Sequence, residues 1–440
     1  MIRNVNESTI LRIKNRSLLD YSQIHFSLKN ETVKAIESFG LPLEKNDIED
    51  SRQMKLAQLK ASGAIFRNNN KSILSNSRIS SACEACQTGT GSFTTFVSLK
   101  CHRDCYFCFN KNQDDYSFYV SNHKDINKEL TELLASGVTL KHLAITGGEP
   151  LLHKEETLRF IQLANKLTPD TYTRLYTAGD LLDVETLNGL KDYGLDEIRF
   201  SIKMEDSPQK IKHVLSKIAL SKDYVPNVLV EMPVIPGTMD RMKELLLELE
   251  ELDIFGINLL EFCFPLENAK AFQERELELK NPPYEVFYNY WYAGGLAVAN
   301  SEQMCMELVE FAMEKNLKLG VHYCSLENKF TGQIYQQNHD HKLGETYLFS
   351  EKDYFLKTAK VFGKDQKKIR EILEQNQIPF VINSEYDYLQ FSINAIEKLG
   401  KNNVDIIISS NVVESEGNDQ LIREVNIQWT TPLLFEKQDV

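Results

Sequence analysis

The chain has 440 residues, of which 42% are hydrophobic, so it holds enough apolar material for packed cores and is long enough for two or three domains. Its 63 acidic and 50 basic residues give a formal charge of −13, which disfavours a nucleic-acid partner. Because neither a run of about 18 apolar residues nor an N-terminal signal segment is present, we expect no membrane span and a cytoplasmic protein whose thiols stay reduced.

Residues 1–80 differ in pattern from the middle of the chain. Apolar alternation predicts two strands, over 8–15 and 22–28, and a helix follows over 31–40. A second helix ends at Gly63. The pattern resembles the small winged-helix-like domain with which many peptide-modifying enzymes hold a leader peptide by strand addition. We therefore expect a small α+β domain that either binds a peptide or caps the rest of the fold.

The middle of the chain repeats a short β-rich run followed by an amphipathic helix. Six strands are expected, over 93–100, 142–150, 172–179, 197–203, 226–237 and 256–265. Strands that alternate with helices favour parallel pairing with right-handed crossovers. An open doubly wound sheet and a full or partial barrel both satisfy this pattern, and both place the active site at the carboxyl ends of the strands. The fold class is therefore α/β, with this domain at 81–330 and a C-terminal α/β extension at 331–440.

Three of the eight cysteines lie within eight positions, directly after the first of these strands. Cys101, Cys105 and Cys108 follow the spacing C-x3-C-x2-C. Three thiolates from one loop can hold three irons of a [4Fe-4S] cluster and leave the fourth iron without a protein ligand. The spacing also permits zinc, although zinc usually takes four ligands, and a C-x2-C redox pair would not need Cys101.

Gly147, Gly148, Glu149 and Pro150 end the second expected strand. Together with the cysteine spacing and Phe107, which precedes the third cysteine, they resemble the radical SAM superfamily, whose members carry CxxxCxxC after the first barrel strand and GGE after the second. The glycines let the backbone approach a ligand closely, and the carboxylate of Glu149 can accept a hydrogen bond from an ammonium group.

This resemblance, which covers residues 93–265, implies a partial (β/α)6 barrel and a reaction. In the family, the open iron of the [4Fe-4S] cluster binds S-adenosylmethionine (SAM), one electron cleaves the sulfonium, and the 5′-deoxyadenosyl radical abstracts a hydrogen atom from the substrate. The electron donor would be a flavodoxin or a ferredoxin. Ser201 and Lys203, at the end of the fourth strand, would contact SAM or its ribose. Two polar residues at a solvent-exposed strand end are an equally good interpretation.

Five cysteines lie outside this loop. Cys83 and Cys86 form a C-x2-C pair, which supplies two of the four thiolates of a tetrahedral metal site. Cys324, at the end of an apolar strand, is the expected third ligand of this second metal, which would be iron, zinc or an auxiliary iron–sulfur cluster. Two unligated thiols are the simpler explanation of the pair. The alternative further ligands are Cys263, Cys305 and His322.

The C-x2-C pair followed by Gly89, shortly ahead of CxxxCxxC, resembles one radical SAM branch in particular. This branch contains the methanogenesis marker protein-arginine C-methyltransferase, which uses cobalamin. The likeness covers only residues 83–108, and no cobalamin motif follows. Methylation is therefore one open outcome, and cobalamin is not assumed.

The sixth expected strand carries Leu259, Glu261 and Cys263 on one face, because side chains alternate along a strand. If that face lines the barrel, Cys263 could donate a hydrogen atom to a substrate radical, as peptide epimerases of this superfamily require, and Glu261 could contact substrate or act as a general base. A small core residue and a carboxylate paired within the fold are the alternatives.

Three functions remain open. We favour a radical SAM enzyme that modifies a peptide or protein side chain. The second function is a radical SAM enzyme that acts on a small metabolite, and the third is an iron–sulfur or zinc module without SAM chemistry. The sequence does not determine the substrate, the second metal or the oligomeric state. It also does not determine whether SAM acts as a cosubstrate or as a cofactor.

Overall fold

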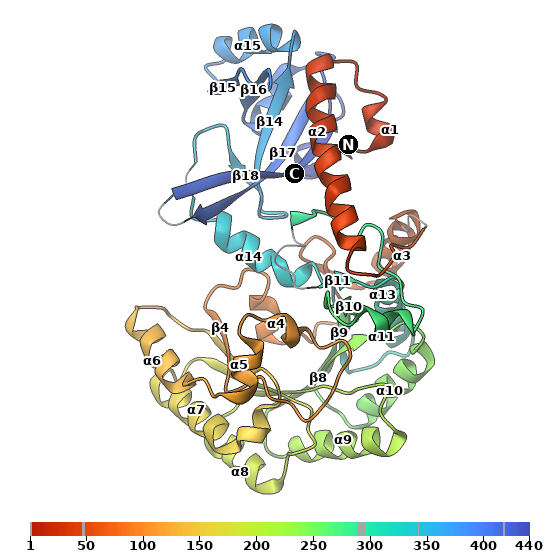
Figure 1. Cartoon of the computed structure of the whole chain (residues 1–440), viewed down its shortest axis with the longest axis vertical. Helices are drawn as coiled ribbons and strands as arrows, with labels where there is room; N and C mark the ends of the chain where they lie inside the picture. The colour runs from red at the N-terminus through yellow and green to blue at the C-terminus, as the bar shows by residue number, and fades with distance from the viewer. Residues whose placement is uncertain (1, 46–48, 289–294, 342, 417–418) are drawn as a thin grey trace. The chain divides into compact units, whose positions relative to one another are not determined.

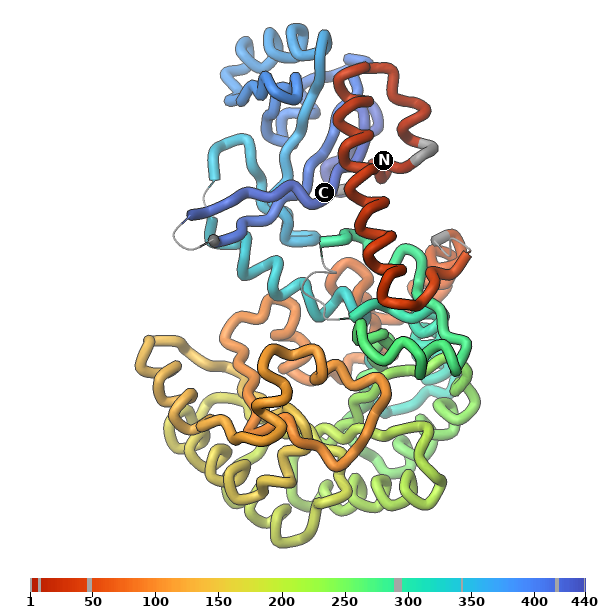
Figure 2. Tube along the Cα trace, viewed as in Figure 1, coloured from red at the N-terminus to blue at the C-terminus, as the bar shows by residue number. Residues whose placement is uncertain are grey.

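The computed structural model describes residues 2–45, 49–288, 295–341, 343–416 and 419–440 (Figures 1 and 2). The chain forms two compact units, and each of them is discontinuous in sequence. Unit 1 comprises residues 1–38, 285–292 and 330–440, and unit 2 comprises residues 39–284 and 293–329. Boundaries between the units fall after Ser38 and after Lys329, and none falls at residue 80. Among the described residues, no helix combines the length and the apolar character needed to cross a bilayer.

Unit 2 is built on a nine-stranded sheet with the order β2-β3-β12-β9-β8-β7-β6-β5-β4. The strands from β4 to β9, together with β12, run parallel, and β3 and β2 extend the sheet in antiparallel fashion. The strands are β2 (Ile65–Arg67), β3 (Ser72–Leu74), β4 (Ser92–Phe96), β5 (His142–Thr146), β6 (Tyr172–Thr177), β7 (Glu197–Phe200), β8 (Asn227–Val234), β9 (Gly256–Glu261) and β12 (Gly320–Cys324). All six expected barrel strands are present. The seventh parallel strand, β12, was not predicted as part of the sheet.

Amphipathic helices alternate with the parallel strands, and their apolar faces form the main core of unit 2 with one face of the sheet. The helices that follow strands are α6 (Ile126–Ala135), α7 (Lys154–Leu167), α8 (Val184–Asp192), α9 (Pro208–Ser221), α10 (Met239–Glu251) and α13 (Ser301–Glu314). Asp125, Asp183 and Ser207 begin α6, α8 and α9 by accepting hydrogen bonds from backbone N–H groups. The βα units follow one another around the sheet (Figure 2), as a partial barrel requires.

Shorter elements complete unit 2. They are α3 (Glu49–Ala61), α4 (Ser81–Ala85), α5 (Tyr116–Ser121), α11 (Ala269–Gln273), the 3-10 helices η1 (Phe109–Asn112) and η2 (Pro150–His153), and the antiparallel pair β10 (Cys263–Phe264) and β11 (Leu296–Ala297). The helix predicted to end at Gly63 is α3, and Leu56 and Leu59 on it are buried in the core.

Unit 1 contains a second sheet, in which all pairs are antiparallel. Its strands are β1 (Arg3–Asn4), β13 (Leu348–Phe349), β14 (Leu356–Phe362), β15 (Phe380–Asn383), β16 (Tyr388–Phe391), β17 (Ile406–Glu416) and β18 (Asp419–Thr430). Its helices are α1 (Glu7–Ile10), α2 (Arg16–Glu37), α15 (Asp365–Gln375), η3 (Ile393–Leu399) and η4 (Lys437–Asp439). A further helix, α14 (Asn328–Asn338), begins at the end of unit 2 and continues into unit 1.

The strands predicted over 8–15 and 22–28 are wrong, because the end of α1 and a turn occupy the first range and a long helix, α2, spans Arg16–Glu37. Asn15 begins this helix by accepting the Leu18 N–H, and Leu18 and Ile36 are buried. Ile24 and Leu28, whose alternation suggested a strand, are about half exposed, at 50% and 58%. The strand pattern on which the likeness to a leader-peptide domain rested is therefore not formed. Instead α2 lies beside the C-terminal strands of the same unit, as the red and blue parts of Figure 2 show.

Candidate functional site

The cysteine loop lies at the carboxyl end of β4, at the edge of the parallel sheet where the sequence placed it. Cys101 is exposed and Cys105 and Cys108 are partly buried. The Cys108 N–H donates to the Cys105 carbonyl at 3.1 Å, and the Arg103 N–H donates to the Cys101 sulfur at 3.4 Å. Burial raises the pKa of Cys105; Lys203 opposes the rise, and Cys108 and Cys101 add to it, so the three thiols lie within electrostatic range of one another.

The GGE turn after β5 packs directly on this loop. The Gly148 N–H donates to the Ser98 carbonyl at 3.1 Å, and the Glu149 N–H donates to the Lys100 carbonyl at 2.9 Å. A Cβ atom on Gly148 would lie 2.0 Å from the Lys100 carbonyl oxygen, and one on Gly147, whose φ is +110°, would lie 2.6 Å from a side-chain carbon. The glycines are therefore required by close approach of the chain to itself, whereas the sequence suggested close approach to a ligand.

Glu149 is only 2% exposed and connects the ends of β5 and β6. Its carboxylate accepts hydrogen bonds from the Leu151 N–H at 3.0 Å, the Thr177 hydroxyl at 2.8 Å and the Ala178 N–H at 2.7 Å. Burial raises the pKa of Glu149, although these three hydrogen bonds act to lower it. Two carboxylate oxygens offer about four acceptor positions, so one position remains for an ammonium group.

Charged residues after β6 and β7 form ion pairs with the cysteine loop. Arg103 in the loop donates two hydrogen bonds to Asp180, at 2.6 and 2.7 Å, and also pairs with Asp206. His102 contacts the same carboxylate of Asp180 at 2.7 Å. The sequence did not single out these residues. The feature of the sequence that could have indicated them is an aspartate in the segment after β6 and another in the segment after β7, together with an arginine between the first two cysteines.

Residues at the end of β7 also reach the loop. Lys203 donates to the Asp104 carbonyl at 3.2 Å, and its charge acts on the Cys105 thiol. Ser201 is exposed and donates to the Glu231 carbonyl at 3.3 Å. Phe107 packs edge-on against Phe262, with ring centroids 5.5 Å apart. Pro150, which follows the GGE turn, is buried as the first residue of η2.

Cys83, Cys86 and Cys324 form a second group of thiols. Burial raises the pKa of Cys324 to about 12, and charges on Cys86 and Cys83 act in the same direction, so the three thiols lie within electrostatic range of one another. Cys83 accepts hydrogen bonds from Arg199 at 3.3 Å and from Asn258 at 3.2 Å. The group forms because β12 pairs with β9, which brings the end of a distant segment beside the C-x2-C pair.

Two of the alternative ligands have other roles. Cys305 is fully buried in the main core of unit 2. His322 uses both ring nitrogens, one with the Ser72 hydroxyl at 2.8 Å and one with the Asn258 side-chain oxygen at 3.0 Å. Both ring nitrogens of His322 are therefore occupied, and Cys305 is enclosed by apolar side chains.

The expected inner face of the sixth strand is not formed as predicted. Leu259 packs in the core beneath the helices, β9 ends at Glu261, and Cys263 begins β10. The carboxylate of Glu261 pairs with Lys280 at 3.0 Å and accepts the Leu326 N–H at 2.8 Å. Glu261 is therefore paired within the fold, which was the alternative to a catalytic role.

The donor atoms of both cysteine groups fit a soft metal or an iron–sulfur cluster, because each group offers three thiols. Cys101, Cys105 and Cys108 meet the further requirement of an accessible side, since Cys101 is exposed. In the described ranges, no three His, Cys, Asp or Glu side chains are already arranged around one point as metal ligands.

Comparison with known proteins agrees with this geometry. The family model described as the radical SAM superfamily matches residues 95–249. Residues 95–249 belong to the radical SAM superfamily. A protein of Methanocaldococcus jannaschii, named provisionally as a glycyl-radical enzyme activating enzyme, is 26% identical over 316 residues, which cover 69% of this chain and 80% of the relative. The range 95–249 that the family model matches includes Cys101, Cys105, Cys108 and the GGE turn. The methyltransferase branch stays a prediction.

Two solved structures are similar to the chain. SuiB of Streptococcus suis bound to the precursor peptide SuiA is 13% identical, with a TM-score of 0.40, and the match covers 74% of this chain and 67% of that one. Native anSMEcpe with bound AdoMet and the Cp18Cys peptide is 18% identical, with a TM-score of 0.33, over 40% of this chain and 51% of that one.

Proposed function

We propose that the chain holds a [4Fe-4S] cluster through Cys101, Cys105 and Cys108 and cleaves SAM reductively to methionine and a 5′-deoxyadenosyl radical. The observation that carries this proposal is the meeting of three thiols from one loop with the GGE turn at the carboxyl edge of a parallel sheet. When bound, the cluster supplies one electron to the sulfonium of SAM.

The protein's own residues would orient SAM beside the loop. Glu149 keeps one acceptor position for the amino group, while its other hydrogen bonds fix the ends of β5 and β6. Ser201 and Lys203 stand at the carboxyl end of β7, where a hydroxyl and an ammonium group suit the ribose and the carboxylate. Phe107 supplies apolar surface on the loop.

We further propose that the substrate is a peptide or a protein. The relative from Methanocaldococcus jannaschii supports this, because a glycyl-radical enzyme is itself a protein. Cys263 is the proposed hydrogen donor to the substrate radical, and burial raises its pKa, which keeps the thiol protonated. We propose the cytoplasm as its location and a flavodoxin or ferredoxin as the electron donor.

A second metal is proposed at Cys83, Cys86 and Cys324. The support is the close approach of the three thiols, which come from α4, the end of α4 and the end of β12. Three protein ligands would leave a fourth position for an exogenous ligand.

The experiment is anaerobic reconstitution followed by iron and sulfide analysis and an assay of 5′-deoxyadenosine from SAM and dithionite. The variants are a triple alanine at Cys101, Cys105 and Cys108, and Cys305→Ala as the matched control, because Cys305 lies in the core of unit 2 and not in the cysteine loop. We expect wild type and Cys305→Ala to hold about four more irons than the triple variant and to produce 5′-deoxyadenosine. If wild type binds zinc and does not cleave SAM, the module without SAM chemistry is correct. Iron retained by the triple variant would measure the second site.

A further inference from the structure

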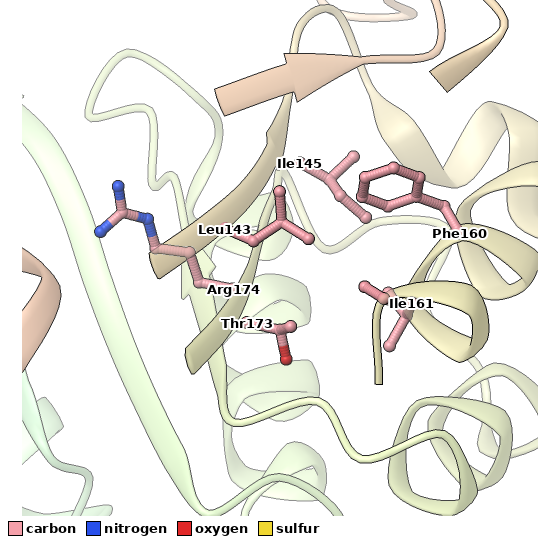
Figure 3. Close-up of a pocket in the computed structure, with 7 residues that line it drawn as sticks. Leu143, Ile145, Phe160, Ile161, Thr173 and Arg174 are labelled. Carbon is pink, nitrogen blue, oxygen red and sulfur yellow. The ribbon is translucent and has the colours of Figure 1, made fainter. Parts of the chain in front are cut away.

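The inner face of the unit 2 sheet, which is the side away from the core helices, carries a connected set of polar side chains. Figure 3 shows the two sides near β6, where Leu143, Phe160 and Ile161 face one another and the guanidinium of Arg174 points away from them. Side chains alternate along a strand, so a residue between two core residues of a strand lies on the inner face. On β7, β8, β9 and β12 these inner residues include Arg199, Glu231, Asn258 and His322.

Three of these side chains form a hydrogen-bonded row across neighbouring strands. Glu231 on β8 is in register with Asn258 on β9, and Asn258 is in register with His322 on β12. One N–H of the Asn258 amide donates to the Glu231 carboxylate at 2.8 Å, and the amide oxygen accepts the Nδ1–H of His322 at 3.0 Å. The other ring nitrogen of His322 accepts the Ser72 hydroxyl at 2.8 Å. These contacts fix the orientation of the amide, because its NH2 group has to face the carboxylate and its oxygen the ring N–H.

The second N–H of this amide is directed at a sulfur atom. Asn258 donates to Cys83 Sγ at 3.2 Å, and Arg199 Nη2 donates to the same sulfur at 3.3 Å. Arg199 is only 3% exposed, and its other two nitrogens pair with Glu197, at 2.5 Å, and with Glu231. Two N–H donors therefore meet at the Cys83 sulfur, and carboxylates hold each donor in place.

A neutral thiol makes poor use of two such donors, because its sulfur is a weak hydrogen-bond acceptor. A cysteine sulfur that binds a metal carries negative charge, and hydrogen bonds to a charged acceptor are stronger. Hydrogen bonds to the ligand sulfurs also help to set the reduction potential of an iron–sulfur cluster. Two buried donors, one of them cationic, therefore suit a metal-bound sulfur better than a thiol.

The strand pairing places a second thiol on the same face of the sheet. Cys324 follows His322 by two residues on β12, so both side chains lie on the inner face. The sulfur of Cys324 accepts a hydrogen bond from the Asn328 amide at 3.2 Å. Cys86 ends α4, one turn after Cys83. The sulfur that receives the two donors thus belongs to the group of thiols proposed above as the second metal site.

We propose that Arg199 and Asn258 are positioning residues of this second metal site, and that their two N–H···S hydrogen bonds hold the Cys83 sulfur in place as a metal ligand. The inference rests on the second metal of the proposed function and adds the residues that set its affinity. Residues that orient a metal ligand in this way typically contribute 10–100-fold to metal affinity. The row from Glu231 to His322 acts through Asn258, because it keeps the amide N–H directed at the sulfur.

The test is anaerobic titration with Co²⁺ of a full-length parent protein in which Cys101, Cys105 and Cys108 are replaced by alanine, which leaves the second group of thiols. The sulfur-to-cobalt absorption band reports both the affinity and the electron density on the sulfur, and Cys83→Ala in the same parent identifies the part of the band that this site contributes. We expect Asn258→Ala to bind Co²⁺ about 10–100-fold more weakly. Its band should move to longer wavelength, because the lost hydrogen bond had lowered the energy of the sulfur electrons.

The matched control is Asn227→Ala on β8, because the Asn227 amide donates to the Tyr172 hydroxyl at 3.0 Å and to the Asp196 carbonyl at 3.2 Å instead of to a sulfur. It should bind Co²⁺ as the parent does. Arg199→Lys is a second variant, since lysine keeps a positive charge between the two carboxylates but lacks the planar fork that reaches the sulfur. Its band should move in the same direction as that of Asn258→Ala.

The position of the band separates a contact with the sulfur from a role in folding alone, which would change the amount of bound Co²⁺ and leave the band in place. An unchanged band in both Asn258→Ala and Arg199→Lys would overturn the proposal, and so would an equal loss of affinity in Asn227→Ala. If the parent shows no sulfur-to-cobalt band, the second metal itself is wrong and the inference falls with it. Co²⁺ binding needs no turnover, so failure of 5′-deoxyadenosine formation in wild type would count against SAM cleavage alone.

Discussion

Replacement of Asp180 by asparagine tests whether the salt bridge to Arg103 keeps the cysteine loop in order. In wild type, Asp180 accepts two charge-assisted hydrogen bonds from Arg103, at 2.6 and 2.7 Å, from a position outside the loop. Asparagine keeps the size of the side chain but removes the charge and one acceptor oxygen. The variant therefore weakens the connection between the loop and the end of β6 without opening a cavity.

The size of the effect follows from the contacts. A hydrogen bond to a charged group contributes about 1.5–3 kcal/mol. The side chains of Arg103 and Asp180 are 13% and 23% exposed, so solvent screening reduces this contribution. A net loss of about 2 kcal/mol from the free energy that keeps the loop ordered corresponds to about 30-fold weaker binding of a cluster.

The assay is loss of iron from the reconstituted protein during titration with a chelator, followed by absorbance. Asp183→Asn is the matched control, because Asp183 pairs with Lys154 and begins α8, a task that asparagine also performs. We expect Asp180→Asn to lose iron at much lower chelator concentration than the control and wild type. Equal retention in all three proteins would show that the loop is ordered without the salt bridge, and the reasoning would be wrong.

Two further variants test other contacts of unit 2. Burial acts to raise the pKa of Glu302, but Lys280 and Arg52 lower it. The ionised carboxylate therefore stabilises the fold at neutral pH, and this stabilisation is lost as the pH falls below the ordinary pKa of a glutamate. Glu302→Gln should lower the free energy of unfolding by about 3–5 kcal/mol at pH 7 and by less at pH 4, measured by urea titration, and an equal loss at both would contradict the ion pairing. Gly148→Ala should lower the iron content strongly, because its Cβ would lie 2.0 Å from a carbonyl oxygen, whereas Gly344→Ala, with open space around it, should keep full iron content.

The sequence predicted the barrel strands well because each strand is a separate apolar run between helix signals. The helices after β5, β7 and β8 followed from apolar positions three and four residues apart, and the structure buries those positions in one core. The N-terminal region was not predicted, because alternation over a few residues cannot distinguish a strand from the exposed side of a long helix such as α2.

The residues that form the candidate site divide in the same way. The sequence by itself predicted Cys101, Cys105, Cys108 and the GGE turn as parts of one site, because each group is contiguous and its chemistry depends on spacing within one loop. Only the tertiary structure decided that Asp180 pairs with Arg103 and that the pairing of β12 with β9 brings Cys324 within electrostatic range of the C-x2-C pair. These contacts join segments far apart along the chain, and the pairing order of the strands fixes them.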